Sequence, residues 1–252
     1  MKNKNYVCGR FAYRSDVGKV RISNEDQAFA AINQSGNILL LVCDGMGGQN
    51  KGDLASNIAK KCIVDEFRKK NKFFTKPGAI HWVNKVICYA NKEIYRLANE
   101  NPLYKEMGTT ITLALIINNF LIYAQMGDSR LYILDKKNNF KQISEDQTYV
   151  GYLYRSHQIT KEEMKVHPKR HLLMNALGIF PSASIDIEFR KYSNESLLLC
   201  SDGLYNNASD EDIASIVKGE DTTEEKINQL ISLANSNGGS DNISVVLWEA
   251  NK

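Results

Sequence analysis

The sequence lacks the cysteine pattern of a disulfide framework or a zinc site. Its five cysteines are odd in number, lie far apart and form no C-x-x-C pair. This usage fits a reducing compartment, and we expect a cytoplasmic protein. The first segment, MKNKNYVCGRF, has no apolar core, so we expect no signal peptide. No apolar run approaches the roughly 18 residues that a membrane span requires, so no membrane partner is expected.

The sequence also lacks a large excess of one charge. Its 32 basic and 29 acidic residues are interspersed and give a formal net charge of +3. Nucleic-acid binding would require basic residues concentrated on one face, so we expect no nucleic-acid partner. No low-complexity segment and no linker rich in Pro, Gly or Ser divides the chain. We therefore expect one domain over residues 1–252, acting as a monomer.

Strand and helix patterns in the sequence are partly segregated and predict an α+β fold. Apolar residues recur at helical spacing in two long segments, and two shorter helices are expected near the end: 53–70, 80–100, 210–217 and 223–234. Strands are expected in a hairpin, a meander and three later segments: 26–44, 109–143, 184–192, 196–202 and 243–250. Closely spaced strands must pair antiparallel, because parallel crossovers need a dozen or more residues. Residues 146–181 appear irregular and basic, with a short helix near 161–166.

Acidic residues follow the apolar strand patterns. The segment LLLVCDGMGG reaches Asp44 and then a turn containing Gly45, Gly47 and Gly48, and LLLCSDGLYN reaches Asp202. Other acids lie at strand ends or glycine turns: Glu25, Asp26, Asp128 and Asp241. A single Asp before Gly is usually a turn residue. A set of carboxylates beside buried strands is costly unless another group compensates their charge.

Few basic residues lie near these acids in the sequence. Arg21 and Arg130 leave a surplus of negative charge. Oxygen ligands without an adjacent histidine favour Mg²⁺ or Mn²⁺ over zinc. Two interpretations of Arg21 are open: a bidentate phosphate ligand, or a salt bridge to Glu25 or Asp26. Metals, several acids and an arginine together predict a phosphoester hydrolase.

Eight segments occur in the order found in bacterial metal-dependent protein phosphatases, the protein phosphatase 2C family. They are SDVGKVRISNEDQ, LLLVCDGMGG, MGTTITLALI, MGDSRLYIL, ISEDQTYV, HPKRHLLMNALG, LLLCSDGLYN and GGSDNISVV. The chain resembles this family over about residues 9 to 248. The resemblance implies a four-layer αββα sandwich of two antiparallel sheets flanked by helices, with a metal site at one edge of the sheets. Residues 146–181 match the flap of the family.

The resemblance also implies a metal ligand set. Asp44 matches an acid that bridges two metal ions, and the carbonyl of Gly45 matches a ligand of the second ion. Asp202 and Asp241 match ligands of the first ion. Asp128 matches an acid that binds a third, weaker ion together with Asp202. The alternative for Asp128 is a structural role as the partner of Arg130.

Three further residues complete the implied catalytic site. Glu25 and Asp26 match acids that hold metal-bound water, and Arg21 matches the arginine that binds phosphate. The resemblance implies two to three Mn²⁺ or Mg²⁺ ions and a bridging hydroxide that attacks phosphorus without a phosphoenzyme. Met46 occupies the position of a histidine that protonates the leaving group in eukaryotic members. A thioether cannot donate that proton.

The function implied is hydrolysis of phosphoserine and phosphothreonine in proteins that a serine/threonine kinase has phosphorylated. One alternative is a related enzyme that acts on small phosphorylated molecules. Another is a catalytically weak or inactive member that binds phosphoproteins as a regulatory module. Inactive copies usually lose metal-ligand acids, and all the matching acids are present here.

Overall fold

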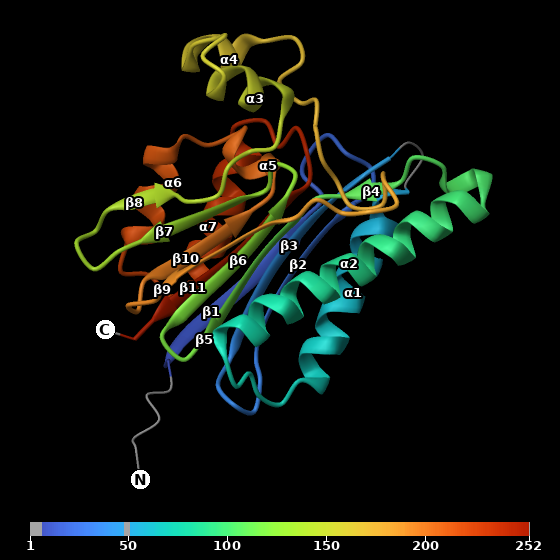
Figure 1. Cartoon of the computed structure of the whole chain (residues 1–252). Coiled ribbons are helices and arrows are strands. Elements are labelled where there is room, and N and C mark those ends of the chain that lie inside the picture. Colours follow the sequence, from blue (N-terminus) through green and yellow to red (C-terminus); the bar gives the residue numbers. More distant parts are fainter. Residues whose placement is uncertain (1–6, 48–50, 252) are drawn as a thin grey trace.

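A computed structural model describes residues 7–47 and 51–251, and Gly48 of the glycine-rich turn lies outside these ranges. Two antiparallel sheets face each other (Figure 1). The first contains, in spatial order, β1 (Gly9–Asp16), β11 (Ile243–Ala250), β10 (Ser196–Cys200), β7 (Arg130–Leu134) and β8 (Phe140–Gln142). The second contains β2 (Asp26–Ile32), β3 (Ile38–Met46), β5 (Ile111–Ile117), β6 (Phe120–Met126) and β9 (Asp186–Lys191), and β4 (Gly108–Thr109) pairs with β3.

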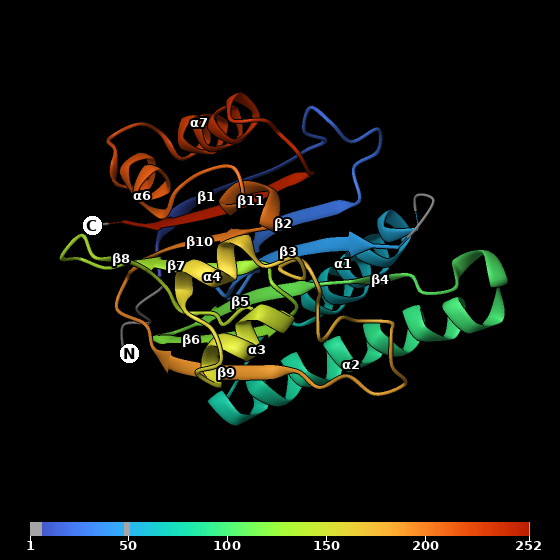
Figure 2. The same ribbon diagram turned by 90° about the horizontal axis from the view of Figure 1, so that it is seen from above.

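Helices cover the outer faces of both sheets, as the view from above shows (Figure 2). The helices of the described chain are α1 (Gly52–Lys69), α2 (Lys76–Glu100), α3 (Tyr149–Arg155), α4 (Lys161–Val166), α5 (Asp202–Tyr205), α6 (Asp210–Lys218) and α7 (Thr223–Ser236), with a short 3-10 helix, η1 (Pro102–Tyr104), and α3 and α4 stand at one end of the sandwich (Figure 1). The pair α1 and α2 packs on the second sheet, and α6 and α7 pack on the first. The predicted four-layer αββα sandwich is therefore confirmed. No helix in the described part of the chain is long and apolar enough to span a membrane.

Local sequence signals explain where the helices begin. The side chain of Thr75 caps α2 by accepting a hydrogen bond from the Gly78 N–H. Thr222 and Glu225 form a reciprocal capping box at the start of α7. The predicted long helices are confirmed within a few residues of their expected ends.

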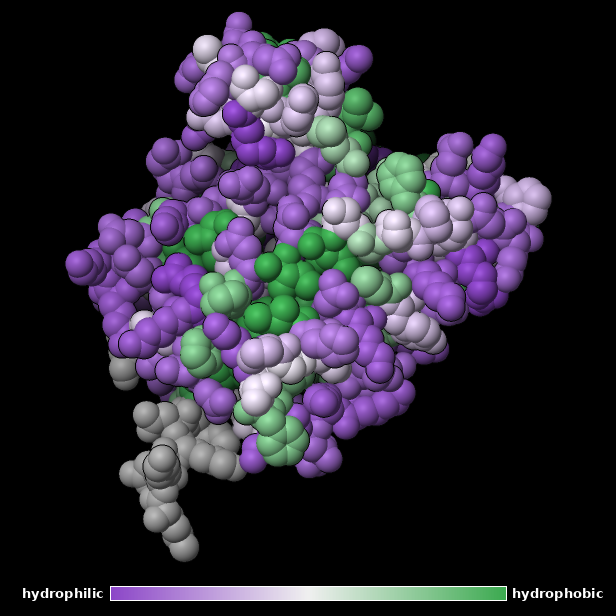
Figure 3. Space-filling model, viewed as in Figure 1, coloured by the Kyte–Doolittle hydropathy of each residue, from purple (hydrophilic) through white to green (hydrophobic). Residues whose placement is uncertain are grey.

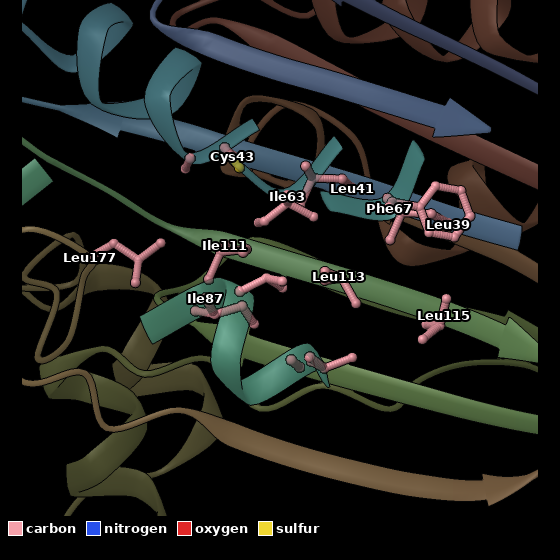
Figure 4. Packing of buried hydrophobic residues seen from close by; sticks show 14 of the residues in the cluster. Leu39, Leu41, Cys43, Ile63, Phe67, Ile87, Ile111, Leu113, Leu115 and Leu177 are labelled. Carbon is pink, nitrogen blue, oxygen red and sulfur yellow. The ribbon is translucent and has the colours of Figure 1, made fainter. Parts of the chain in front are cut away.

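Alternation along β3 divides its side chains between two apolar layers. Leu39, Leu41 and Cys43 face α1 and α2, where they meet Ile63, Phe67 and Ile87 (Figure 4). The intervening residues belong to the core between the sheets: Ile38, Leu40 and Val42. Side chains of a strand alternate with a period of two, so Asp44 continues the row that faces the other sheet.

The rows that face between the sheets become polar at one end of the sandwich. On β2, Ala28 and Ala30 lie in the core between the sheets, and Asp26 continues their row. On β11, Ser244 occupies the next position in the row that contains Val246 and Trp248. This polar end lies on the side of α3 and α4, opposite the two chain ends (Figure 1). Strand alternation therefore places the acids at the end of the space between the sheets.

The sequence analysis missed several short elements, η1 and α5 among them, and also β1 and α3. The strand β1 lies at the edge of its sheet, and most of its side chains are at least partly exposed, so its apolar pattern is weak. The helix α3 lies in the segment expected to be irregular before 161. Its start at Thr148, whose hydroxyl accepts from the Gly151 N–H at 3.0 Å, is a capping signal that was overlooked. The predicted short helix at 161–166 is confirmed as α4.

We expect Leu40→Ala to test the core between the sheets. Leu40 has no exposed surface, and removing a buried leucine side chain costs about 2–5 kcal/mol. Urea denaturation should show this loss in the free energy of unfolding. Leu103→Ala, at a leucine that is 68% exposed, is the matched control and should cost less than about 1 kcal/mol. Equal effects of the two substitutions would contradict the assigned core.

Candidate metal centre

Four of the predicted aspartates form one cluster. Asp26 and Asp44 are directly opposite each other in the β2–β3 register. The carboxyl groups of Asp44 and Asp202 share a hydrogen bond. Asp128, in the turn before β7, lies close enough to raise the pKa of Asp44 electrostatically, as does Asp241. Four segments therefore bring their acids to one place: β2, β3, the turn between β6 and β7, and the start of α5 after β10.

Burial is the largest cause of raised pKa values in this cluster. It raises the pKa of Asp26 to about 7, that of Asp128 to about 8 and that of Asp202 to about 6. The pKa of Asp44 is raised well above its ordinary value by burial and then by the neighbouring Asp26 and Asp202. Carboxylates that repel one another in a poorly solvated place favour their neutral forms.

Hydroxyl groups that the sequence analysis missed hold two of these acids. Ser201 Oγ donates to Asp26 Oδ2 at 2.6 Å and accepts from the Ser244 N–H at 2.9 Å. Thr110 Oγ1 accepts from the Asp44 N–H at 3.0 Å. All three hydroxyl residues are buried. The sequence does carry a signal for these residues. Each is a polar residue at a position where the apolar pattern of a strand would otherwise continue.

Arg21 lies at the rim of the cluster. Its guanidinium pairs with Asp241 Oδ2 at 2.7 Å and is 54% exposed. The suggested salt bridge to Glu25 or Asp26 was therefore wrong about the partner. The pKa of Arg21 is raised, chiefly by this hydrogen bond to Asp241.

The loop that carries Arg21 is fixed by a residue to which the sequence analysis gave no role. Asn242 Nδ2 donates to the carbonyls of Val17 and Ser23, each at 2.9 Å. Asn242 Oδ1 accepts from the Glu25 N–H at 2.9 Å. One amide side chain beside Asp241 thus clamps both ends of the Arg21 loop.

The backbone at Gly45 is enclosed too tightly for any side chain. A Cβ atom there would lie 2.2 Å from the carbonyl oxygen of Gly52 and 2.5 Å from that of Glu25. The Gly45 N–H donates to the Glu25 carbonyl at 3.2 Å. The Gly52 N–H, at the start of α1, donates to the Glu25 carboxylate, whose pKa is nevertheless raised, mainly by burial. Glycine at position 45 therefore permits the close approach of β3, α1 and Glu25.

Asp128 is 7% exposed; burial and then Asp202 and Asp146 raise its pKa, and Arg130 only partly opposes them. Arg130 pairs instead with Asp146, with NH2 at 2.6 Å from Oδ2. The backbone carbonyl of Asp128 accepts from the Tyr205 hydroxyl at 3.2 Å. The structural alternative, an Arg130–Asp128 ion pair, is therefore replaced by an Arg130–Asp146 pair.

The donors of the cluster fit a hard divalent cation. They are carboxylate oxygens in excess of the neighbouring cationic groups, and such sets bind Mg²⁺ or Mn²⁺. Within residues 7–47 and 51–251, no three acidic, His or Cys side chains are already arranged around a metal position. The carboxyl groups instead contact one another, Ser201 and Arg21. A cation would replace these contacts and the protons that the raised pKa values retain.

Comparisons with known proteins agree with this geometry. Residues 18–247 match the family model described as "Protein phosphatase 2C". The chain is 35% identical over 242 residues to the serine/threonine phosphatase Stp of Listeria welshimeri, covering 95% of each chain.

Solved structures are similar over nearly the whole length. A serine/threonine phosphatase of Staphylococcus aureus shares 32% identity with a TM-score of 0.91, covering 97% of this chain and 96% of that one. The catalytic domain of the phosphatase PstP, solved with two manganese ions, shares 31% identity with a TM-score of 0.86, covering 97% and 99%.

The chain belongs to the protein phosphatase 2C family. In this phosphatase residues 146–181, here called the flap, carry α3 and α4 and stand at the top of the view in Figure 1. Its outer surface is largely hydrophilic (Figure 3). Burial and then Arg170 lower the pKa of His171 in the flap, and Asp241 opposes them. His171 of the flap therefore lies within electrostatic range of Asp241.

We expect the metal-free phosphatase to lose stability as the pH rises from about 5 to about 8. The folded pKa values of Asp26, Asp128 and Asp202, about 7, 8 and 6, lie above the ordinary value of 3.8. In this window the folded chain holds protons that the unfolded chain has released, so the free energy of unfolding falls with pH. A loss of about 2 kcal/mol would lower Tm by roughly 4–8 °C.

Calorimetry with a chelator present, repeated between pH 5 and 8, would measure how steeply Tm falls with pH. Asp128→Asn should flatten this slope, because it removes the group with the highest of the three values. Millimolar Mn²⁺ should also flatten it, because the cation takes the place of the protons. A metal-free Tm that is constant or rises between pH 5 and 8 would contradict the raised pKa values.

Proposed function

We propose that the chain is a metal-dependent phosphatase that hydrolyses phosphoserine and phosphothreonine in proteins. The observation that carries this proposal is the cluster of Asp26, Asp44, Asp128 and Asp202 at the end of the space between the sheets, with Arg21 at its rim. Family membership and relatives named as serine/threonine phosphatases support the reaction type. Nothing favours a small phosphorylated molecule or a catalytically inactive regulatory role.

The proposed ligands come from the cluster and the residues around it. Asp44 would contact two ions, and the Gly45 carbonyl would bind one of them. Asp202 and Asp241 would hold the other, and Asp128 with Asp202 would hold a third. Glu25 and Asp26 would bind through water. We propose two to three Mn²⁺ or Mg²⁺ ions, a choice that the oxygen-only donor set supports.

Bound divalent cations supply Lewis acidity that activates water as the nucleophile and offsets the charge of the phosphoryl group. Arg21 would exchange Asp241 for the phosphoryl oxygens, and an ion pair this exposed costs little to break. Asn242 keeps the Arg21 loop in place during that exchange. Met46 cannot protonate the leaving oxygen, so that proton has to come from water or another side chain.

We further propose a single catalytic domain over residues 1–252, a monomer that acts in the cytoplasm without a nucleic-acid or membrane partner. No disulfide joins cysteines among the described residues, which fits a reducing compartment. The substrates would be phosphoproteins produced by a serine/threonine kinase. The flap would border the path by which they reach the cluster.

We expect dephosphorylation of a phosphothreonine peptide to require Mn²⁺ or Mg²⁺ and to stop in excess EDTA. Asp44→Asn should abolish nearly all turnover, because it removes an anionic ligand proposed to contact two ions. Asp221→Asn, at an exposed aspartate between α6 and α7 whose carboxylate accepts from Gln229, should retain wild-type turnover. Phosphate release, with calorimetry to confirm folding, measures each effect. Full activity in EDTA, or half the activity in Asp44→Asn, would refute the proposed metal site.

We expect Arg21→Ala and Asp128→Ala to have different effects on inhibition by phosphate. Arg21→Ala should weaken the inhibition about ten- to a hundred-and-fifty-fold, because a charged hydrogen bond contributes roughly 1.5–3 kcal/mol. Asp128→Ala should instead lower kcat and raise the Mn²⁺ concentration required, with nearly unchanged inhibition. Steady-state kinetics across a Mn²⁺ titration would measure both. The third-ion role fails if Asp128→Ala weakens phosphate as much as Arg21→Ala and keeps the wild-type metal requirement.

A further inference from the structure

Arg130 is the centre of a polar network beside the acid cluster. It lies on β7, two residues after Asp128. Its Nε and NH2 atoms donate to the Asp146 carboxylate at 3.1 and 2.6 Å. Its NH1 atom donates to the Tyr132 hydroxyl at 3.1 Å, which donates in turn to Asp210 at 3.1 Å. The side chains of Arg130 and Asp146 are only 20% and 15% exposed.

Tyr205 connects this network to two of the clustered acids. Its ring lies under the guanidinium, with the Arg130 Cζ atom 3.5 Å from the ring centroid. Its hydroxyl donates to the Asp128 carbonyl at 3.2 Å. Tyr205 also ends α5, the single helical turn that begins at Asp202. One side chain thus links the turn that carries Asp128 to the turn that carries Asp202.

Asp146 connects the same network to the start of the flap. Next to it, Gln147 exchanges two hydrogen bonds with Gly127: its N–H donates to the Gly127 carbonyl at 2.9 Å, and its Oε1 atom accepts from the Gly127 N–H at 3.1 Å. Arg155 of α3 donates to the Asp146 carbonyl at 3.1 Å. The first residues of the flap are therefore fastened to the turn immediately before Asp128.

We propose that Tyr205, held by Arg130, is a positioning residue that sets the separation of Asp128 and Asp202 and couples it to the flap. The proposal rests on the metal role given above to these two acids. A rigid aromatic ring clamped by a guanidinium transmits a displacement better than a flexible side chain does. Movement at the base of the flap would then change how well the two acids bind a cation together.

Stability alone is a weak explanation for this network. Buried ion pairs contribute little net stability, because desolvation offsets their attraction. A positioning role makes the Tyr205 hydroxyl, rather than the ring, the decisive group.

The experiment compares Tyr205→Phe with Tyr132→Phe. Each substitution removes one hydroxyl from an aromatic residue that contacts Arg130, but only Tyr205 reaches Asp128. Mn²⁺ binding to the metal-free protein is measured by electron paramagnetic resonance of the free ion. The weakest class of Mn²⁺ site should weaken about three- to tenfold in Tyr205→Phe, the range of one lost neutral hydrogen bond. Tyr132→Phe should lower Tm and leave Mn²⁺ binding at the wild-type level.

A second measurement tests the coupling to the flap. In the wild type, Mn²⁺ should slow amide hydrogen exchange in residues 146–181. In Tyr205→Phe, the same concentration of Mn²⁺ should give much less protection. Coupling between two sites is reciprocal, so weaker metal binding and lost protection must occur together. Kinetics should show a lower kcat at limiting Mn²⁺ with unchanged KM for p-nitrophenyl phosphate.

The outcomes separate this inference from the proposed function. If the wild type binds no Mn²⁺, the proposed function fails and the inference fails with it. If the wild type binds Mn²⁺ and Tyr205→Phe binds it equally well, only the positioning role is overturned. Equal weakening of Mn²⁺ binding in Tyr205→Phe and Tyr132→Phe would also overturn the positioning role. That result would mean that loss of either hydroxyl disturbs the packing around Arg130.

Discussion

Poor solvation of several neighbouring carboxyl groups, together with their mutual repulsion, is the constraint on which the rest of the structure depends. Asp26, Asp44, Asp128 and Asp202 come together where water solvates them poorly, and each has a raised pKa. No flexible loop would hold such groups together, because they would separate to reach solvent. Two packed sheets prevent that separation, since their strands share an apolar core immediately behind the acids.

Several contacts around the cluster each offset part of the free-energy cost of bringing these carboxyl groups together. Ser201 donates to Asp26, and Arg21 pairs with Asp241 at the rim. Arg130 partly opposes the raised pKa of Asp128, but its own partner Asp146 acts in the other direction. None of these contacts neutralises the cluster, which remains rich in protons when no cation is present. The same arrangement that strains the metal-free protein is the one that a divalent cation stabilises.

Much of the fold and of the acid set could be predicted from the sequence, because strand alternation and glycine turns are local signals. Asp44 follows an apolar run, and Gly45 follows it at once. The exposed edge strand β1 has no such regular pattern and was missed. The pairing of Arg130 with Asp146 was also missed, because two residues 16 positions apart meet only through the packing of β7 against the flap base. Asn242 was missed for the same reason.

The alternation of β3 between two layers has a consequence for errors in folding. A shift of one residue in the pairing of β2 with β3 would turn every side chain of β3 to the opposite face. The sulfur of Cys43 would then occupy the acid cluster, and the carboxyl group of Asp44 would enter the apolar layer under α1. Such a misfolded chain would lose both its core and its proposed metal site. One error of register would therefore remove stability and the proposed chemistry together.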